Sequence, residues 1–165
     1  MLIGLAPLAS SGTRLLILGS FPGAASLAAQ QYYAHPRNQF WPILQAIWPD
    51  SPMNSGVNSY EIRSDNLLAR GLGLWDVYAA CERDGSLDAD IRQAVPSDLA
   101  GLVAGCPGLQ AIAHNGGESF KHARLTGAFG LPVHRLPSSS PAHASWSFER
   151  KLAAWRTVFK THGLV

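Results

Sequence analysis

The stretch LLILGSFPG, residues 15–23, decides the fold of this 165-residue chain. Four apolar residues in succession, followed at once by glycine, serine and proline, indicate a buried strand that ends in a turn. Three more apolar runs lead through a turn into a helical stretch, at residues 72–77, 109–113 and 133–136. Strands that alternate with helices need crossover connections, so a mainly parallel four-stranded sheet is expected.

Helices are expected on both faces of this sheet. Apolar residues recur with helical spacing over residues 40–48, where Asn38 occupies an N-cap position and Pro42 falls in the first turn. Further helices are expected over residues 59–70, 96–104, 117–125 and 145–162. The pattern predicts one α/β domain, residues 1–165, with three layers, α/β/α. Ligands of such sheets bind beyond the carboxyl ends of the strands, so the four turns are where a site is expected.

Composition narrows the class of protein. Hydrophobic residues make up 47% and charged residues 15%, which is typical of a compact globular chain. Cys81 and Cys106 are too few and too far apart for a zinc or iron–sulfur site, so two ordinary thiols, no metal and no cofactor are expected. No apolar run is long enough to span a membrane and the first ten residues lack a basic leader, so we expect a cytoplasmic protein without a membrane partner. The net charge of +2 permits nucleic acid as a partner without requiring it.

The turn Gly19-Ser20-Phe21-Pro22-Gly23 can present backbone N–H groups to an anion, although an ordinary tight turn explains it as well. It lacks the lysine of a P-loop and the third glycine of a dinucleotide fingerprint. Leu18 stands where a nucleophile elbow needs glycine. Nucleotide cofactors and serine-hydrolase chemistry are therefore disfavoured at this turn.

Residues 32–41, YYAHPRNQFW, hold the densest group of aromatic, amide and basic side chains. Aromatic rings stack on nucleobases, amides read their edges and Arg neutralises phosphate. An equally simple interpretation makes Asn38 an N-cap and Phe40 and Trp41 core residues. Local chemistry leaves both interpretations open.

The combination of GSFPG with HPRNQFW resembles the first motif region of the uracil-DNA glycosylase superfamily, and in particular its hypoxanthine (deoxyinosine) glycosylase branch. In that branch the catalytic amide belongs to the Asn of the N-x-F-W segment, which is Asn38 here. Phe21 stands where other branches carry a water-positioning Asn. The segment HNG at residues 114–116 and the segment LPSSSPAHA at residues 136–144 are similar to later motifs, and the resemblance spans residues 14–160. The histidine that supports the departing uracil in the best-known branch is replaced by Leu136.

The resemblance implies a set of site residues. Phe40 is expected to stack on a flipped base, and Asp76 to bind the base or activate water, unless it simply caps the next segment. Tyr33 and Trp75 are expected to wall the pocket, although core packing explains Trp75 as well. The other base-binding candidates are Gly19, Ser20, Phe21 and Asn115. The candidates for contact with DNA are Arg37, Ser138, Ser139, Ser140, Pro141 and His143, with Pro141, Ala142 or His143 as the wedge.

The function implied is that of a monofunctional, monomeric DNA glycosylase that removes a deaminated base, hypoxanthine in preference, from DNA. Lys121 is the only lysine near the motifs in sequence, which disfavours an imine-forming lyase. The alternatives are a uracil- or mismatch-specific glycosylase, a serine hydrolase built from the 138–140 serines with His143 and Asp76, and a non-catalytic nucleic-acid-binding domain.

Overall fold

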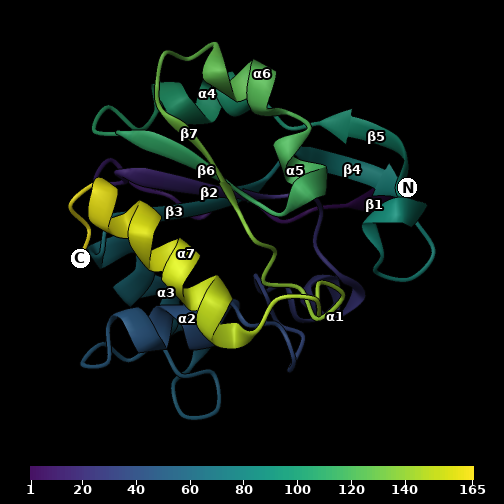
Figure 1. The fold of residues 1–165 in the computed structure, drawn as a ribbon. Coiled ribbons are helices and arrows are strands. Elements are labelled where there is room, and N and C mark those ends of the chain that lie inside the picture. Colours follow the sequence, from purple (N-terminus) through teal and green to yellow (C-terminus); the bar gives the residue numbers. More distant parts are fainter.

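A four-stranded parallel sheet forms the centre of the computed structural model, which describes all residues, 1–165 (Figure 1). The strand order is β3-β2-β6-β7, and each neighbouring pair is parallel. The strands are β2 (Leu15–Gly19), β3 (Leu72–Asp76), β6 (Ala111–Asn115) and β7 (Val133–Leu136). The predicted α/β class and its four-stranded sheet are confirmed.

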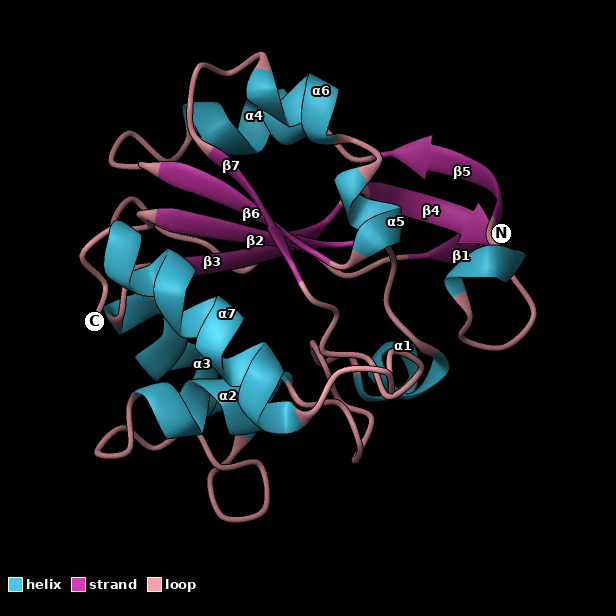
Figure 2. Ribbon diagram, viewed as in Figure 1, coloured by secondary structure: helices cyan, strands magenta, loops and turns pink.

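Side-chain alternation along β2 separates two cores. Leu15 and Ile17 point into the larger core, whereas Leu16 and Leu18 point into a smaller core on the opposite face. Helices α2, α3 and α7 cover the first face and α4, α5 and α6 the second, as Figure 2 shows. Because β2 is buried on both faces, its sequence is continuously apolar and shows no alternation.

Four helices lie close to the predicted ranges, whereas the short helix over residues 24–29 was not predicted. The stretch predicted as one helix over residues 117–125 forms two short helices instead, and the last helix begins at Phe148, after Ser147 accepts the hydrogen bond that caps it. None of the helices has the length and apolar character needed to cross a bilayer. The helices are α1 (Ala24–Ala29), α2 (Phe40–Ile47), α3 (Tyr60–Ala69), α4 (Leu99–Ala104), α5 (Gly117–Phe120), α6 (Ala123–Gly127) and α7 (Phe148–Thr161).

A second, antiparallel sheet was not predicted. It has the order β1-β4-β5, formed by β1 (Leu2–Ile3), β4 (Tyr78–Glu82) and β5 (Arg92–Pro96), with the 3₁₀ helix η1 (Asp88–Asp90) between β4 and β5. Only Val77 separates β4 from β3, so the sequence shows one apolar run where there are two strands. All five residues of β5 are exposed, which removes the alternation that identifies a half-buried strand.

His114 anchors the smaller core through a chain of hydrogen bonds. The Ser119 hydroxyl donates to the Leu18 carbonyl at 2.7 Å, so its oxygen accepts from His114 Nδ1 at 2.8 Å. His114 Nε2 then accepts from the Thr126 hydroxyl at 2.8 Å. Burial, reinforced by the nearby His122, lowers the pKa of His114 to about 4. The neutral ring therefore joins β6 to β2, α5 and α6.

This burial predicts acid sensitivity. The unfolded chain binds a proton at His114 below about pH 6.5 while the folded chain resists it to about pH 4, so stability falls across this interval by about 3 kcal/mol. We expect His114→Gln to be less stable than the wild type at about pH 7 and to lose less stability on acidification to about pH 4.5. Urea unfolding at both pH values measures the difference, and equal losses in the two proteins would contradict the assignment.

Candidate active site

A cavity of about 320 Å³ opens at the carboxyl ends of β2, β3 and β6. Its wall comes from six regions of the chain: the turn after β2, the loop before α2, the end of β3, the β4–β5 connection, the end of β6 with the start of α5, and the loop after β7. Every predicted site residue lines it except Phe40 and Arg37. The predicted residues in the wall are Gly19, Ser20, Phe21, Asn38, Asp76, Asn115, Ser138, Ser139, Ser140, Pro141 and His143.

The register of the sheet brings the polar strand ends together. Gly19 is paired with Asp76, and Leu18 with His114, which places Asn115 one step further along the neighbouring strand. The chain leaves β2 toward β3 on one side and leaves β6 toward β7 on the other, so the cavity lies at a switch point of the sheet. A Cβ on Gly19 would lie 2.5 Å from Asp76 Oδ1 and 3.4 Å from the Tyr33 hydroxyl. Only glycine fits at this strand end.

Asn38 precedes the N-cap of α2, which is Gln39, so the expected N-cap role is wrong, and its catalytic role stays a prediction. Its Oδ1 accepts the Phe40 N–H at 2.9 Å, so the side chain orders the chain as it enters α2. The side chain also lines the cavity, and a carbonyl oxygen keeps a second lone pair after one hydrogen bond. The contact with Phe40 therefore fixes the direction of the amide and leaves it able to hold a water molecule.

The expected stacking of Phe40 on a base is not what the structure shows. Phe40 has no exposed surface, lies outside the cavity wall and stacks on Tyr33 with ring centroids 4.1 Å apart. Tyr33, held at a positive φ of 56°, lines the cavity in its place. Trp75 also lies outside the wall, and its indole N–H donates to the Leu5 carbonyl. The phenylalanine thus supports an aromatic wall and does not form it.

Ser139 is the point at which three segments meet. Its N–H donates to Asn115 Oδ1 at 3.0 Å, its hydroxyl accepts from Asn115 Nδ2 at 3.0 Å, and its carbonyl accepts from the Gln39 N–H at 2.9 Å. Asn115 Nδ2 also donates to the Tyr33 hydroxyl at 3.2 Å. With its amide engaged in this way, Asn115 joins the loop after β7 to the aromatic wall.

The loop after β7 is ordered by its own serines. Ser138 Oγ accepts the Ser140 N–H at 3.1 Å, and Ser140 Oγ accepts the Ala142 N–H at 3.2 Å. Both hydroxyl hydrogens stay available for a phosphate. His143 Nε2 has no hydrogen-bond partner, and no serine of the loop is bonded to a histidine, so the loop lacks the Ser–His pair that the serine-hydrolase alternative needs.

A lysine that the sequence left unnoticed contacts this loop. Lys151 of α7 is 2% exposed, and its Nζ donates to the His143 carbonyl at 2.7 Å. Burial lowers the pKa of this amine. Lys151 lies outside the cavity wall, while Lys121 pairs with Glu118 on the surface at 3.0 Å. Neither amine faces the cavity.

Asp76 is the buried carboxyl group of the cavity wall. It is 5% exposed, and its Oδ2 has no hydrogen-bond partner. Burial, followed by repulsion from Asp88 and opposed by Arg83, raises the pKa of its carboxyl to about 7. The alternative role as a helix cap does not apply, because the strand β4 follows at Tyr78.

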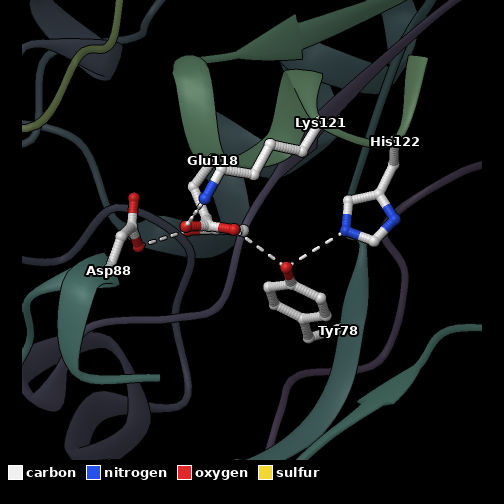
Figure 3. A network of polar contacts seen from close by, with 6 residues as sticks. Tyr78, Asp88, Glu118, Lys121 and His122 are labelled. Carbon is white, nitrogen blue, oxygen red and sulfur yellow. Dashed lines mark hydrogen bonds and ion pairs between the residues drawn. The ribbon is translucent and has the colours of Figure 1, made fainter. Parts of the chain in front are cut away.

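The β4–β5 connection supplies a rim that sequence analysis missed. Ser86 Oγ accepts the Ala24 N–H at 2.9 Å, and the Ser20 hydroxyl donates to Asp88 at 2.6 Å. Figure 3 shows a second tie, in which the Tyr78 hydroxyl contacts Glu118 at 2.9 Å and His122 Nε2 at 3.1 Å. These contacts hold the second sheet against the turn after β2 and against α5. No sequence pattern signalled them, since the residues of the rim, Ser86, Leu87 and Asp88, are all exposed.

Comparisons with known proteins identify the family of this chain. The sequence profile of the Uracil DNA glycosylase superfamily matches residues 6–159. The chain belongs to this superfamily. A relative from Methanosarcina barkeri (strain Fusaro / DSM 804), named hypoxanthine DNA glycosylase, is 33% identical over 95% of this chain and 97% of its own length. A second relative of the same name, from Methanosarcina acetivorans, is 34% identical over 90% of this chain and 91% of its own. The solution NMR structure of a Methanosarcina acetivorans protein described as a candidate uracil DNA glycosylase matches with a TM-score of 0.85 at 33% identity, over 97% of both chains.

Two further placements refine the superfamily site. Leu136, at the position of the motif histidine of the best-known branch, is 1% exposed in the larger core and does not line the cavity. Arg37 is exposed and lies outside the wall, so its contact with DNA stays a prediction.

Cys81 and Cys106 are free and buried, and no group of three or more His, Cys, Asp or Glu side chains is placed to hold a metal ion.

The close approach at Gly19 gives a test of the site geometry. Gly19→Ala should lower the free energy of unfolding by about 1–3 kcal/mol, because the added methyl group overlaps the Asp76 carboxyl. Gly127→Ala is the matched control, since a Cβ there meets nothing within 4 Å and lies in a helix, where alanine is favoured. Urea unfolding compares the two variants. Equal stability would show that the carboxyl moves aside freely.

Proposed function

We propose that this protein is a monofunctional DNA glycosylase that hydrolyses the N-glycosidic bond of a deaminated base, with hypoxanthine as the preferred base. The observation that carries the proposal is that Asn38, Tyr33 and Asp76 line one cavity, which the serine-rich loop also lines. Two relatives that match nearly the whole chain and bear the name hypoxanthine DNA glycosylase support the choice of base.

The cavity meets the chemical needs of such a reaction. A base inside a duplex is out of reach, so the nucleotide must leave the stack and enter a pocket. The cavity volume of about 320 Å³ lies within the range of small-molecule sites. Asn38 has little basicity, but it can orient a water molecule toward the sugar carbon, and positioning alone lowers a barrier by several kcal/mol.

The absence of a lysine in the cavity wall supports hydrolysis by water over imine formation. The loop of residues 138–143 lies at the mouth, where its free hydroxyl hydrogens suit backbone phosphates and its apolar and ring side chains suit the space left by the base. Action as a monomer stays a prediction, which light scattering can check.

The role of Asn38 is testable with a matched pair of variants. Asn38→Ala should reduce the single-turnover rate of hypoxanthine release by at least about 100-fold and leave DNA affinity nearly unchanged, because the amide positions water and does not grip the backbone. Asn54→Ala is the control: Asn54 Oδ1 accepts the Gly56 N–H at 2.8 Å, the same local contact, at a position outside the cavity wall. Release from a duplex with one deoxyinosine, followed after alkaline cleavage, measures the rate.

Normal release by Asn38→Ala would contradict its catalytic role. If the wild-type protein binds DNA but releases no base, the non-catalytic alternative is favoured. Parallel duplexes with one deoxyuridine separate the two glycosylase alternatives, and release of uracil alone would contradict the preference for hypoxanthine.

A further inference from the structure

The departing base needs a proton or a strong hydrogen bond, and the donor is not where the superfamily motif would place it. Leu136 at the position of the motif histidine is buried in the core and has no polar atom on its side chain. Asn115 Nδ2 already donates to Ser139 and to Tyr33. The Ser138 and Ser140 hydroxyls of the wall can donate a hydrogen bond, but as weak acids they do not transfer a proton, so an acidic group is needed for protonation.

Asp76 has the placement that such a donor requires. It lies at the carboxyl end of β3, 5% exposed, in the wall of the cavity. Its Oδ2 is buried without a hydrogen-bond partner, and it forms no ion pair. A buried polar group without a partner is costly, so an unpaired carboxyl facing a binding cavity points to a ligand that completes its hydrogen bonds.

The charged and titratable groups around Asp76 come from three segments. Asp88 of η1 is a like charge, Arg83 of the β4–β5 connection is an opposite charge, and Tyr32 and Tyr33 face the carboxyl from the loop before α2. Arg83 is already committed, since it donates to the carbonyl groups of Gly85 and Pro22. With burial as the largest cause, these surroundings raise the pKa of Asp76 to about 7, which keeps much of the group neutral near neutrality.

We propose that the neutral carboxylic acid of Asp76 is the general acid of this site and donates its proton to the departing base. This inference rests on the proposed glycosylase function. As the bond between C1′ and the base nitrogen breaks, its electron pair goes to the base, which takes the Asp76 proton and leaves as a neutral molecule. The water held by Asn38 forms the C1′–O bond and releases one proton to solvent. The Asp76 carboxylate then takes a proton from solvent, so the cycle consumes one water and regenerates the acid.

The test is the pH dependence of single-turnover release from a duplex with one deoxyinosine, between about pH 5.5 and about pH 9. The wild-type rate should be level at low pH and fall about tenfold per pH unit above about pH 7. Asp76→Asn keeps the shape and a donor but has no proton to transfer, so its rate should be about 100-fold lower and independent of pH. Asp88→Asn removes the like charge and should move the wild-type break to lower pH.

Asp65→Asn, on the exposed side of α3, is the matched control and should leave the profile unchanged. An Asp76→Asn profile that keeps the wild-type break overturns the inference. So does a wild-type rate that rises with pH, because Asp76 would then act as a base. If the wild type releases no hypoxanthine at any pH, the proposed function itself fails. Asp76→Asn removes a costly buried charge, so urea unfolding should find it at least as stable as the wild type at about pH 8.

Discussion

Parallel pairing of three buried strands is the constraint on which the site depends. The register aligns Gly19 of β2 with Asp76 of β3, and the β2–β6 pairing brings Asn115 alongside. Because side chains alternate between the faces of a sheet, this register also decides which residues of β2 enter each core. The packing of both helical layers and the chemistry at the strand ends are thus set by the same alignment, and neither can change without the other.

Hydrogen bonds connect the strand ends to the surrounding loops. Asn115 accepts a hydrogen bond from the Ser139 N–H, and the Ser139 carbonyl accepts one from the Gln39 N–H. At the far end of the same loop, Lys151 donates to the His143 carbonyl. Ser139 and Lys151 are buried and their partners are half-buried, so leaving these groups without a hydrogen bond would be costly. The cavity therefore has walls that are positioned before a ligand arrives, which is a condition for catalysis by orientation.

Sequence reasoning found most of this architecture because strong local signals carry it. Four apolar runs placed the strands, helical spacing placed the main helices, and the resemblance of GSFPG and HPRNQFW to the superfamily motifs placed most of the cavity wall. The sequence did not predict β5 or the rim at Ser86 and Asp88, because exposed residues leave no periodic signal. Tyr33 lines the cavity in place of Phe40 because of how the two rings stack, and Lys151 contacts the loop that directly precedes its own helix. Both are consequences of tertiary packing, which spacing along the chain does not encode.

The acidic residues of the β4–β5 connection affect how a charged molecule approaches the cavity. Asp84, Asp88 and Asp90 are exposed there, and the one arginine between β4 and η1, Arg83, is buried and turned toward the chain itself. The serine loop, which also lines the cavity, has no acidic residue between positions 129 and 148. A polyanion near the cavity is repelled more strongly by the β4–β5 connection than by the serine loop. This uneven distribution of charge favours one orientation of a polyanion at the cavity over the reverse orientation.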